Sequence, residues 1–324
     1  MVRRGLFFLR MLWATIWLSL AFARAAWYFK RRALHDLGLP QAESLSSKEK
    51  RRLQHYLYGA TYLSVIFCML RNRIRSRREK HRFTNLAALA YFFDDLVDSF
   101  RDRDDSGILW QDNPEVYGLA ADGSGLALHF LHNIYQELPP ANLPRFRYYM
   151  HQVFNVETAG RQQDGEASEL PELQRITAEK GGYSVLLFRS VLDNPLSEQE
   201  GETLYQLGYL VQLCDDIFDL WFDRKAGLRT APRQLAEAGL VLELAAFFEA
   251  QVNRTRHDFG QIKAGSAWAA VHFLVTVTRV CLQHYLDLQK KHGTLPLDDR
   301  AAMVVDMERW EIRIRAAWYL VRRI

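Results

Sequence analysis

The sequence predicts an all-α protein, and three observations predict it. Glycine and proline are sparse, at 18 and 9 of 324 residues. Between them, long segments carry apolar residues at three- and four-residue spacing, which is the period of an amphipathic helix. Alternation of apolar and polar residues bounded by hairpin turns, the sign of strands, is not evident. Because 49% of the residues are hydrophobic, the chain can bury a substantial core, and a helical bundle is expected.

Polar segments rich in Gly, Pro, Ser or Asp divide the chain into the expected helices. These segments are residues 37–50, 102–115, 137–144, 162–172, 191–202 and 224–233. Such spacing predicts about ten helices joined by short loops, with Ser and Asp available as N-caps. No internal repeat or low-complexity linker divides the chain, so residues 46–324 are expected to form a single domain.

An apolar and basic segment, residues 1–45, precedes this domain. Its uninterrupted apolar run, Met11 to Ala23, lies between Arg10 and Arg24 and is shorter than the ~20 residues that span a bilayer. Three interpretations stay open: a cleaved signal peptide, a helix that lies in a membrane interface, and a first helix packed on the protein's own core. Peripheral contact with the inner face of a membrane is therefore one expectation for this segment.

Charge and cysteine content narrow the function classes. The net charge of +4 is too small to indicate nucleic-acid binding, and no such partner is expected. Cys68, Cys214 and Cys281 are odd in number and far apart, which argues against a disulfide framework or a thiolate metal site. A reducing, cytoplasmic location is expected, and the oligomeric state stays open.

Two aspartate clusters inside apolar runs are the main chemical signal. They read DDLVD at residues 94–98 and DDIFD at residues 215–219. On a helix, positions i and i+4 share a face. One predicted stripe therefore consists of Asp94, Asp98 and Asp102 bordered by Asp95, and the other of Asp215, Asp219 and Asp223 bordered by Asp216.

A solvated helix face would give the same spacing, but two such stripes embedded in apolar residues favour a cation site. Buried carboxylates cost several kcal/mol each unless positive charge compensates them. Mg²⁺ is bound in proteins through a few carboxylates together with substrate phosphates and water. Two facing helices of this kind predict a small magnesium cluster completed by a diphosphate, with the neighbouring apolar side chains lining a pocket for a long apolar substrate.

DDLVD and DDIFD resemble the two DDxxD motifs of the class I isoprenoid (terpenoid) synthase superfamily. This superfamily includes trans-prenyl diphosphate synthases, squalene and phytoene synthases and class I terpene cyclases. The resemblance covers roughly residues 60–230 and implies an all-α bundle with two facing Asp-rich helices around a central apolar cavity. It also implies three Mg²⁺ ions that bind and ionise an allylic prenyl diphosphate. The metal ligands that it implies are Asp94, Asp95, Asp98, Asp215, Asp216, Asp219 and Asp223.

Two segments between the motifs, residues 159–164 and 179–188, are similar to the GQxxD and KTxxLF segments of prenyl diphosphate synthases. There a glutamine and a lysine lie near the diphosphate, which makes Gln162, Gln163 and Lys180 candidate contacts. Lys180 also suits a phosphate on chemical grounds, because two glycines follow it and allow close backbone approach. A helix-end lysine beside a turn is the alternative interpretation.

Basic residues flank both motifs. Arg224 and Lys225 directly follow the second motif and are candidate diphosphate contacts by resemblance, although an exposed helix end would carry them equally well. The run RNRIRSRREKHR, residues 71–82, precedes the first motif. This run is interpreted as a solvated loop or a contact with an anionic membrane rather than as a substrate site.

The chain departs from the chain-elongating prenyl synthases in two places. It has no GGKR-type segment near the N-terminus, and after the first motif Arg101 and Arg103 stand singly instead of as Arg-Arg-Gly. The arginine that usually precedes the first motif of head-to-head synthases is Phe92 or Phe93. We therefore expect a Mg²⁺-dependent terpene synthase, a lyase acting on one allylic diphosphate. A prenyltransferase on the same metal site, elongating or head-to-head, and a non-catalytic membrane-associated helical protein are the alternatives.

Overall fold

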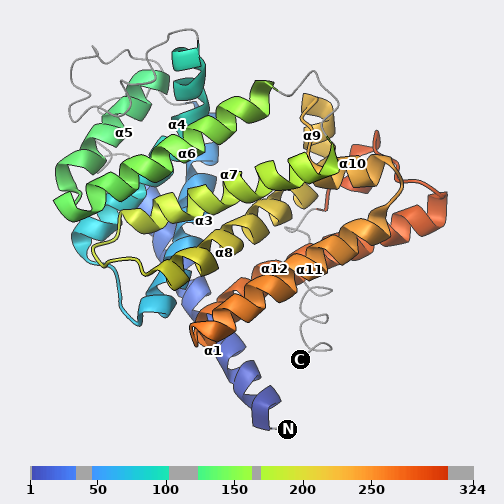
Figure 1. Cartoon of the computed structure of the whole chain (residues 1–324), viewed down its shortest axis with the longest axis horizontal. Helices are drawn as coiled ribbons and strands as arrows, with labels where there is room; N and C mark the ends of the chain where they lie inside the picture. The colour runs from blue at the N-terminus through green and yellow to red at the C-terminus, as the bar shows by residue number, and fades with distance from the viewer. Residues whose placement is uncertain (1, 34–45, 102–122, 163–168, 306–324) are drawn as a thin grey trace. The chain divides into compact units, whose positions relative to one another are not determined.

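The computed structural model describes residues 2–33, 46–101, 123–162 and 169–305 (Figure 1). The regular elements within these ranges are helices, and none of the described residues forms a strand. The all-α prediction is therefore confirmed for the described part of the chain.

The helices have the following bounds: α1 (Val2–Tyr28), the π-turn η1 (Phe29–Ala33), α3 (Ser47–Arg71), α4 (Arg77–Arg101), α5 (Gly123–Glu137), the 3₁₀ turn η4 (Pro140–Asn142), α6 (Leu143–Gln162), α7 (Leu170–Ser190), α8 (Glu198–Phe218), α9 (Leu220–Ala226), α10 (Ala231–Glu237), α11 (Val241–Gln261), α12 (Gly265–His292) and α13 (Arg300–Met303). The predicted breaks at residues 137–144, 191–202 and 224–233 each contain the connection between two helices. The predicted break at residues 102–115 lies outside the described residues. An additional break, which the sequence did not signal, separates α3 from α4 at residues 72–76.

Contacts within the chain define two compact units, and each is described by itself. Unit 1 consists of Met1–Thr15, Ala159–Val185 and Glu198–Ile324, and unit 2 of Ile16–Thr158 and Leu186–Ser197. In unit 1, α8 packs against α10, α11 and α12, and in unit 2, α4 packs against α3 and α5. The predicted domain boundary at residue 45 lies outside the described residues, and the extent of the domain stays a prediction.

Aromatic side chains fill the core of unit 2 around α4. The ring of Phe83 lies 6.1 Å from that of Phe67 on α3 and 5.1 Å from that of Phe188. Phe92 and Phe93, which precede the first aspartate motif, are also buried. This packing fixes the course of the helix that carries Asp94, Asp95 and Asp98, because buried aromatic rings dominate the energetics of a core.

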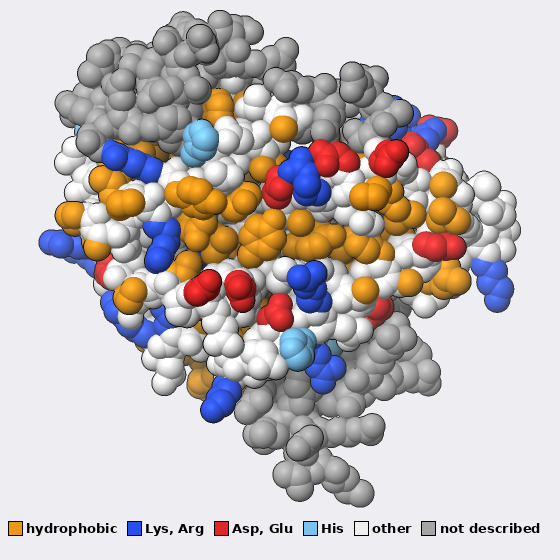
Figure 2. Space-filling view, viewed as in Figure 1, with side chains coloured by type: hydrophobic (Ala, Val, Ile, Leu, Met, Phe, Trp, Pro, Cys, Tyr) orange, Lys and Arg blue, Asp and Glu red, His pale blue; other side chains and the backbone are white. Residues whose placement is uncertain are grey.

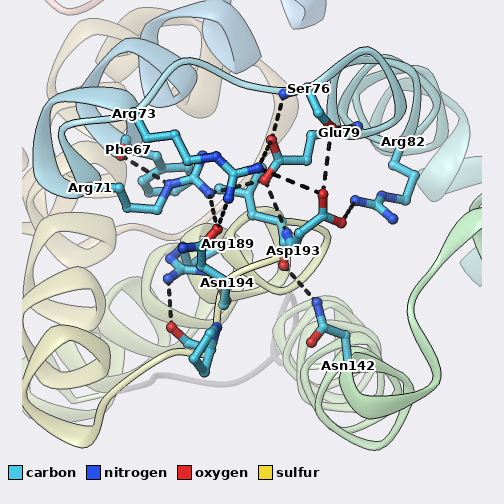
Figure 3. A network of polar contacts seen from close by, with 12 residues as sticks. Phe67, Arg71, Arg73, Ser76, Glu79, Arg82, Asn142, Arg189, Asp193 and Asn194 are labelled. Carbon is cyan, nitrogen blue, oxygen red and sulfur yellow. Dashed lines mark hydrogen bonds and ion pairs between the residues drawn. The ribbon is translucent and has the colours of Figure 1, made fainter.

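The basic run at residues 71–82 is only partly solvated, which corrects the prediction. Arg77, Arg78 and Lys80 are exposed, but Glu79 and Arg82 are 0% and 1% exposed. The side chains that turn inward form the polar network drawn in Figure 3. Their partners lie in the connection between α7 and α8, more than a hundred positions along the chain, so the local sequence could not reveal them.

Glu79 is the centre of this network. Its carboxylate accepts hydrogen bonds from the guanidinium of Arg71 at 3.0 Å, from the Asp193 backbone N–H at 3.0 Å and from the Ser76 backbone N–H at 2.7 Å (Figure 3). Burial alone would raise its pKa, but these donors outweigh burial and lower the pKa of Glu79 to about 2. Arg82 forms an ion pair with Asp193 and closes the network.

Among the described helices, α12 is the one that is long and apolar enough to cross a membrane. Within its most apolar window, 67% of the residues are buried inside the protein. Burial of this extent is expected of a core helix in a globular domain.

Candidate metal and diphosphate site

The second aspartate cluster lies where α8 meets α9. The α8 helix ends at Phe218, yet the Asp219 backbone N–H still donates to the Asp215 carbonyl at 2.8 Å, and the Asp223 N–H donates to the Asp219 carbonyl at 2.7 Å. The three aspartates thus follow each other at intervals of one helical turn. Their predicted i, i+4, i+8 spacing on a helix is confirmed, and their role in binding metal stays a prediction.

Asp216 points away from this stripe toward α7. It is 7% exposed and accepts hydrogen bonds from the Thr177 hydroxyl at 3.0 Å and the Gln212 amide at 2.8 Å. Burial raises the pKa of Asp216 to about 6. Because neutral donors already engage its carboxylate, Asp216 suits a positioning role between the two helices better than that of a metal ligand.

The stripe brings three carboxylates close together, of which Asp215 and Asp219 are exposed and Asp223 is partly exposed. Burial raises the pKa of Asp219 to about 6, and neighbouring Asp215 adds to this effect. Burial likewise raises the pKa of Asp223 to about 7, with further contributions from Asp216 and Asp219. Asp215 is open to solvent although protein surrounds it closely, and burial raises its pKa while Lys180 opposes the rise. A cation would relieve the repulsion among these carboxylates.

The chemistry of these oxygens fits Mg²⁺, but the described side chains do not complete a metal site. Among them, no three His, Cys, Asp or Glu residues lie close enough together to hold an ion. Mg²⁺ commonly takes one or two protein carboxylates and fills its other positions with phosphate oxygens and water. Asp215, Asp219 and Asp223 could serve in this way if a substrate diphosphate supplied further ligands.

Lys180 lies in the middle of α7, so the interpretation as a helix-end lysine beside a turn is wrong. Its ammonium acts on the carboxylates of Asp215 and Asp216 and opposes the rise in pKa that burial causes at both. A cation is thus present on the α7 side of the aspartate stripe, where it could also neutralise a phosphate.

The glycines after Lys180 serve helix packing and not phosphate approach, which corrects the chemical argument from the sequence. A Cβ on Gly181 would lie 2.1 Å from the Gly208 carbonyl oxygen, and a Cβ on Gly182 would lie 2.4 Å from the Tyr205 ring. Three glycines therefore let the backbones of α7 and α8 touch. Gly208 of α8 is the third member of this contact.

Arg224 and Lys225 are held by protein carboxylates. Arg224 lies 3.0 Å from Glu237 and 3.3 Å from Asp298, and the Lys225 ammonium lies 3.6 Å from Asp298. Lys225 also lies 5.8 Å from the centre of the Trp221 ring. A role of either residue in binding diphosphate stays a prediction, and it would require exchange of these partners.

A polar pocket beside Asp223 was missed by the sequence analysis. It has a volume of about 230 Å³ and is lined by Leu173, Arg229, Thr230, Arg233, Gln234 and Glu237. Thr230 connects it to the stripe, because its hydroxyl donates to Asp223 at 3.4 Å and caps α10 by accepting from the Arg233 N–H at 3.3 Å. Two arginines within the predicted break at residues 224–233 were the available signal.

Aromatic side chains line α7 and α8 near the charged groups. Figure 2 shows hydrophobic side chains gathered in a band where α7 and α8 face the viewer. The partly exposed rings of Tyr183 and Tyr205 lie 5.5 Å apart, and Tyr209 follows Tyr205 by one turn. Burial raises the pKa of Tyr205 and of Tyr209 to about 12, so both phenols stay neutral at physiological pH. These helices thus offer apolar surface next to Lys180.

The first aspartate motif is described only in its backbone. Asp94, Asp95 and Asp98 lie on α4, and their side chains lie outside the described residues, as does the side chain of Gln162 at the end of α6. Asp102 and Gln163 lie outside the described residues altogether. The predictions that the two Asp-rich helices face each other and enclose an apolar cavity stay predictions.

The chain has few matches among known proteins. No family model matches its sequence, and none of the curated proteins does. Among solved structures, it is similar to a geranyltransferase from Legionella pneumophila, with a TM-score of 0.48, 13% identity, and coverage of 82% of this chain and 97% of that one. It is also similar to a dehydrosqualene synthase in complex with ligand, with a TM-score of 0.40, 13% identity, and coverage of 84% and 99%.

Proposed function

We propose that this chain is a Mg²⁺-dependent class I terpene synthase that ionises an allylic isoprenoid diphosphate and releases diphosphate. One observation supports this most: Asp215, Asp219 and Asp223 follow one another by single helical turns, and Lys180 of the adjacent helix acts on the same carboxylates. Aligned carboxylates beside a lysine suit Mg²⁺ that is bound together with the oxygens of a diphosphate.

In this proposal the stripe would hold Mg²⁺, and the resemblance of the two motifs assigns Asp94, Asp95 and Asp98 as its further ligands. When bound, the metal supplies charge that stabilises the departing diphosphate. Lys180 binds phosphate oxygens and neutralises part of their charge, while Asp216, held by Thr177 and Gln212, keeps α7 and α8 in register.

The allylic carbon–oxygen bond breaks with its electron pair going to the diphosphate. The aromatic band on α7 and α8 excludes water and places ring faces near the positive charge that develops on the carbon chain. The cation then closes a ring or loses a proton, and the released diphosphate accepts that proton. No side chain is needed as a dedicated base.

Product analysis on the purified chain tests this proposal. The chain is incubated with Mg²⁺ and geranyl, farnesyl or geranylgeranyl diphosphate, each with and without isopentenyl diphosphate. We expect a terpene and free diphosphate from one allylic substrate alone. EDTA and the Asp215→Asn substitution should abolish the product, whereas Asp287→Asn, on the exposed side of α12, should not.

A prenyltransferase is the second candidate, and the polar pocket beside Asp223 favours it. Arg229 and Arg233 line this pocket, and two guanidinium groups suit a second diphosphate. A longer prenyl chain formed only when isopentenyl diphosphate is present would replace the lyase assignment with this one. Two results together would refute both the terpene synthase and the prenyltransferase. The first is no release of diphosphate under any of these conditions, and the second is Mg²⁺ binding that Asp215→Asn leaves unchanged.

A further inference from the structure

We propose that α1 lies on the surface of an anionic lipid bilayer through an apolar face whose side chains are about half exposed. Side chains on this face recur at the three- and four-residue spacing of one side of a helix. They are Leu12, Trp13, Ile16, Leu20 and Trp27, with exposed fractions of 50%, 57%, 45%, 52% and 57%. Large apolar side chains that are half exposed along more than four turns of one helix are unusual on a protein surface facing only water.

The opposite face of α1 already makes the contacts that hold the helix in the fold. Ala14 and Leu18 are 1% and 5% exposed. The Phe22 ring meets the Tyr58 ring of α3 edge-on, with 5.9 Å between their centres. Since this side accounts for the packing of α1, the exposed side is not needed for the protein's own core.

Charge identifies anionic lipid as the partner. Residues 1–35 contain no Asp or Glu, and their basic residues are Arg3, Arg4, Arg10, Arg24, Lys30, Arg31 and Arg32. Of these, Arg24, Arg31 and Arg32 are exposed on or directly after the apolar face. Such a segment is attracted to a surface of anionic headgroups. A second copy of the chain is a poorer partner, because it would bring like charges together on this face.

The dimensions favour a helix that lies on the bilayer and does not cross it. The run from Met11 to Ala23 between Arg10 and Arg24 is shorter than the ~20 residues of a membrane span. Trp13 and Trp27 stand near the ends of the exposed face, where indole rings prefer the headgroup region. The long stems of the arginines let the guanidinium groups reach lipid phosphates while the apolar face enters the acyl boundary.

Cosedimentation of the full chain with vesicles tests the proposal. Vesicles of phosphatidylcholine alone are compared with vesicles containing equal parts of phosphatidylcholine and phosphatidylglycerol. We expect binding to the anionic vesicles, weakened by high salt. The Ile16→Ser/Leu20→Ser variant should lose at least tenfold in partition coefficient. Leu242→Ser, which changes a 69% exposed leucine on α11, is the matched control and should bind as the wild type does.

Charge variants show whether the cations of α1 or those at the start of α4 bind the lipid. They keep the apolar side chains, whose replacement could impair folding. Arg24→Gln/Arg31→Gln/Arg32→Gln should lower the partition coefficient by about fivefold for each cation removed. Arg77→Gln/Arg78→Gln/Lys80→Gln removes three exposed cations at the start of α4 and should bind normally. Circular dichroism confirms that each variant is folded.

Three results would overturn the proposal. The first is no binding of the wild type to anionic vesicles. The second is equal loss of binding in the α1 and α4 charge variants. The third is a dimer that forms without lipid, as detected by sedimentation velocity, and that becomes a monomer in Ile16→Ser/Leu20→Ser. This result would mean that the exposed face of α1 binds a second copy of the chain. Since the readout is lipid binding, failure of the terpene synthase assay leaves this test unaffected.

Discussion

The backbone N–H of Asp219 donates to the carbonyl of Asp215 at 2.8 Å across the junction at which α8 ends and α9 begins. This bond keeps the chain on a helical course through a point where φ and ψ of Asp219, at −91° and 10°, depart from α-helical values. The carboxylate stripe therefore continues from α8 into α9, and Asp223 remains in line with the other two aspartates.

Replacing Asp219 separates the proposed role of the stripe from a structural one. Asp219→Asn should lower the rate of diphosphate release by about 10²-fold or more, since it removes an oxygen charge at the proposed metal site. The same variant should be no less stable than the wild type without metal, because it removes a like charge beside Asp215. Water screens this repulsion at an exposed residue, so any gain in stability is at most about 1 kcal/mol.

Kinetics and urea unfolding of Asp219→Asn without metal check this expectation. Asp287→Asn, exposed on α12, serves as the control for both measurements. A variant that is inactive and also clearly less stable would indicate that Asp219 supports the junction of α8 and α9 and would remove it from the proposed metal site.

Lys180 should contribute through its charge. Lys180→Gln is expected to lower kcat/KM for the allylic diphosphate by about 10- to 100-fold, because a charge-assisted contact to phosphate is lost. Lys180→Arg should retain most of the activity, and Lys290→Gln, exposed near the end of α12, should retain all of it. Equal losses in Lys180→Gln and Lys180→Arg would mean that packing at the crossing of α7 and α8, and not charge, sets the effect.

The glycine contact between α7 and α8 predicts a stability difference between two glycine substitutions. A Cβ on Gly208 would lie 2.2 Å from the Gly181 carbonyl oxygen and 2.7 Å from the Gly182 Cα, both backbone atoms that cannot rotate away. Gly208→Ala should therefore lower the free energy of unfolding by about 1–3 kcal/mol. Gly260→Ala, on α11, meets nothing within 4 Å and should raise it by about 0.5–1 kcal/mol.

Urea unfolding of the two glycine variants measures this difference directly. If Gly208→Ala were as stable as Gly260→Ala, the close approach of the two backbones would be excluded.

Glu79 predicts how stability depends on pH. Its pKa is about 2 in the folded chain and near 4.5 as an ordinary carboxyl, so the unfolded chain binds the proton more tightly. The stabilisation from Glu79 is therefore complete above about pH 5 and is lost as the pH falls toward 2. Glu79→Gln should lower the free energy of unfolding at pH 7 by about 3–5 kcal/mol, because it leaves the buried guanidinium of Arg71 without its partner.

Thermal unfolding between pH 2 and 7 checks both statements about Glu79. The difference between wild type and Glu79→Gln should shrink as the pH falls. Glu202→Gln, exposed on α8, should follow the wild-type profile throughout. A difference that stays constant with pH would show that the network depends on the shape of Glu79 and not on its charge.

The helical class and the stripe were predictable, because both follow from spacing within one helix. Contacts between distant segments were not. Asp216 receives its hydrogen bond from Thr177, 39 positions earlier, and Glu79 accepts from Asp193, 114 positions later. The local sequence of a basic run, or of a lysine followed by two glycines, does not indicate whether these residues face water, a phosphate or another helix. The packing of α7 on α8 decides the case of the lysine and its glycines, and contacts with Asp193 decide that of the basic run.

The crossing of α7 and α8 has a consequence for engineering this chain. Main-chain atoms of Gly181 and Gly208 set the separation of the helices at this crossing, and the Tyr205 ring packs beside Gly182. Randomising Tyr183 and Tyr209 in a library, with Tyr205 kept, would change the shape and polarity of the aromatic surface on α7 and α8 while the spacing of Lys180 from the aspartates is preserved. Substrate preference can thus be varied without changing Lys180 and the aspartates of the stripe.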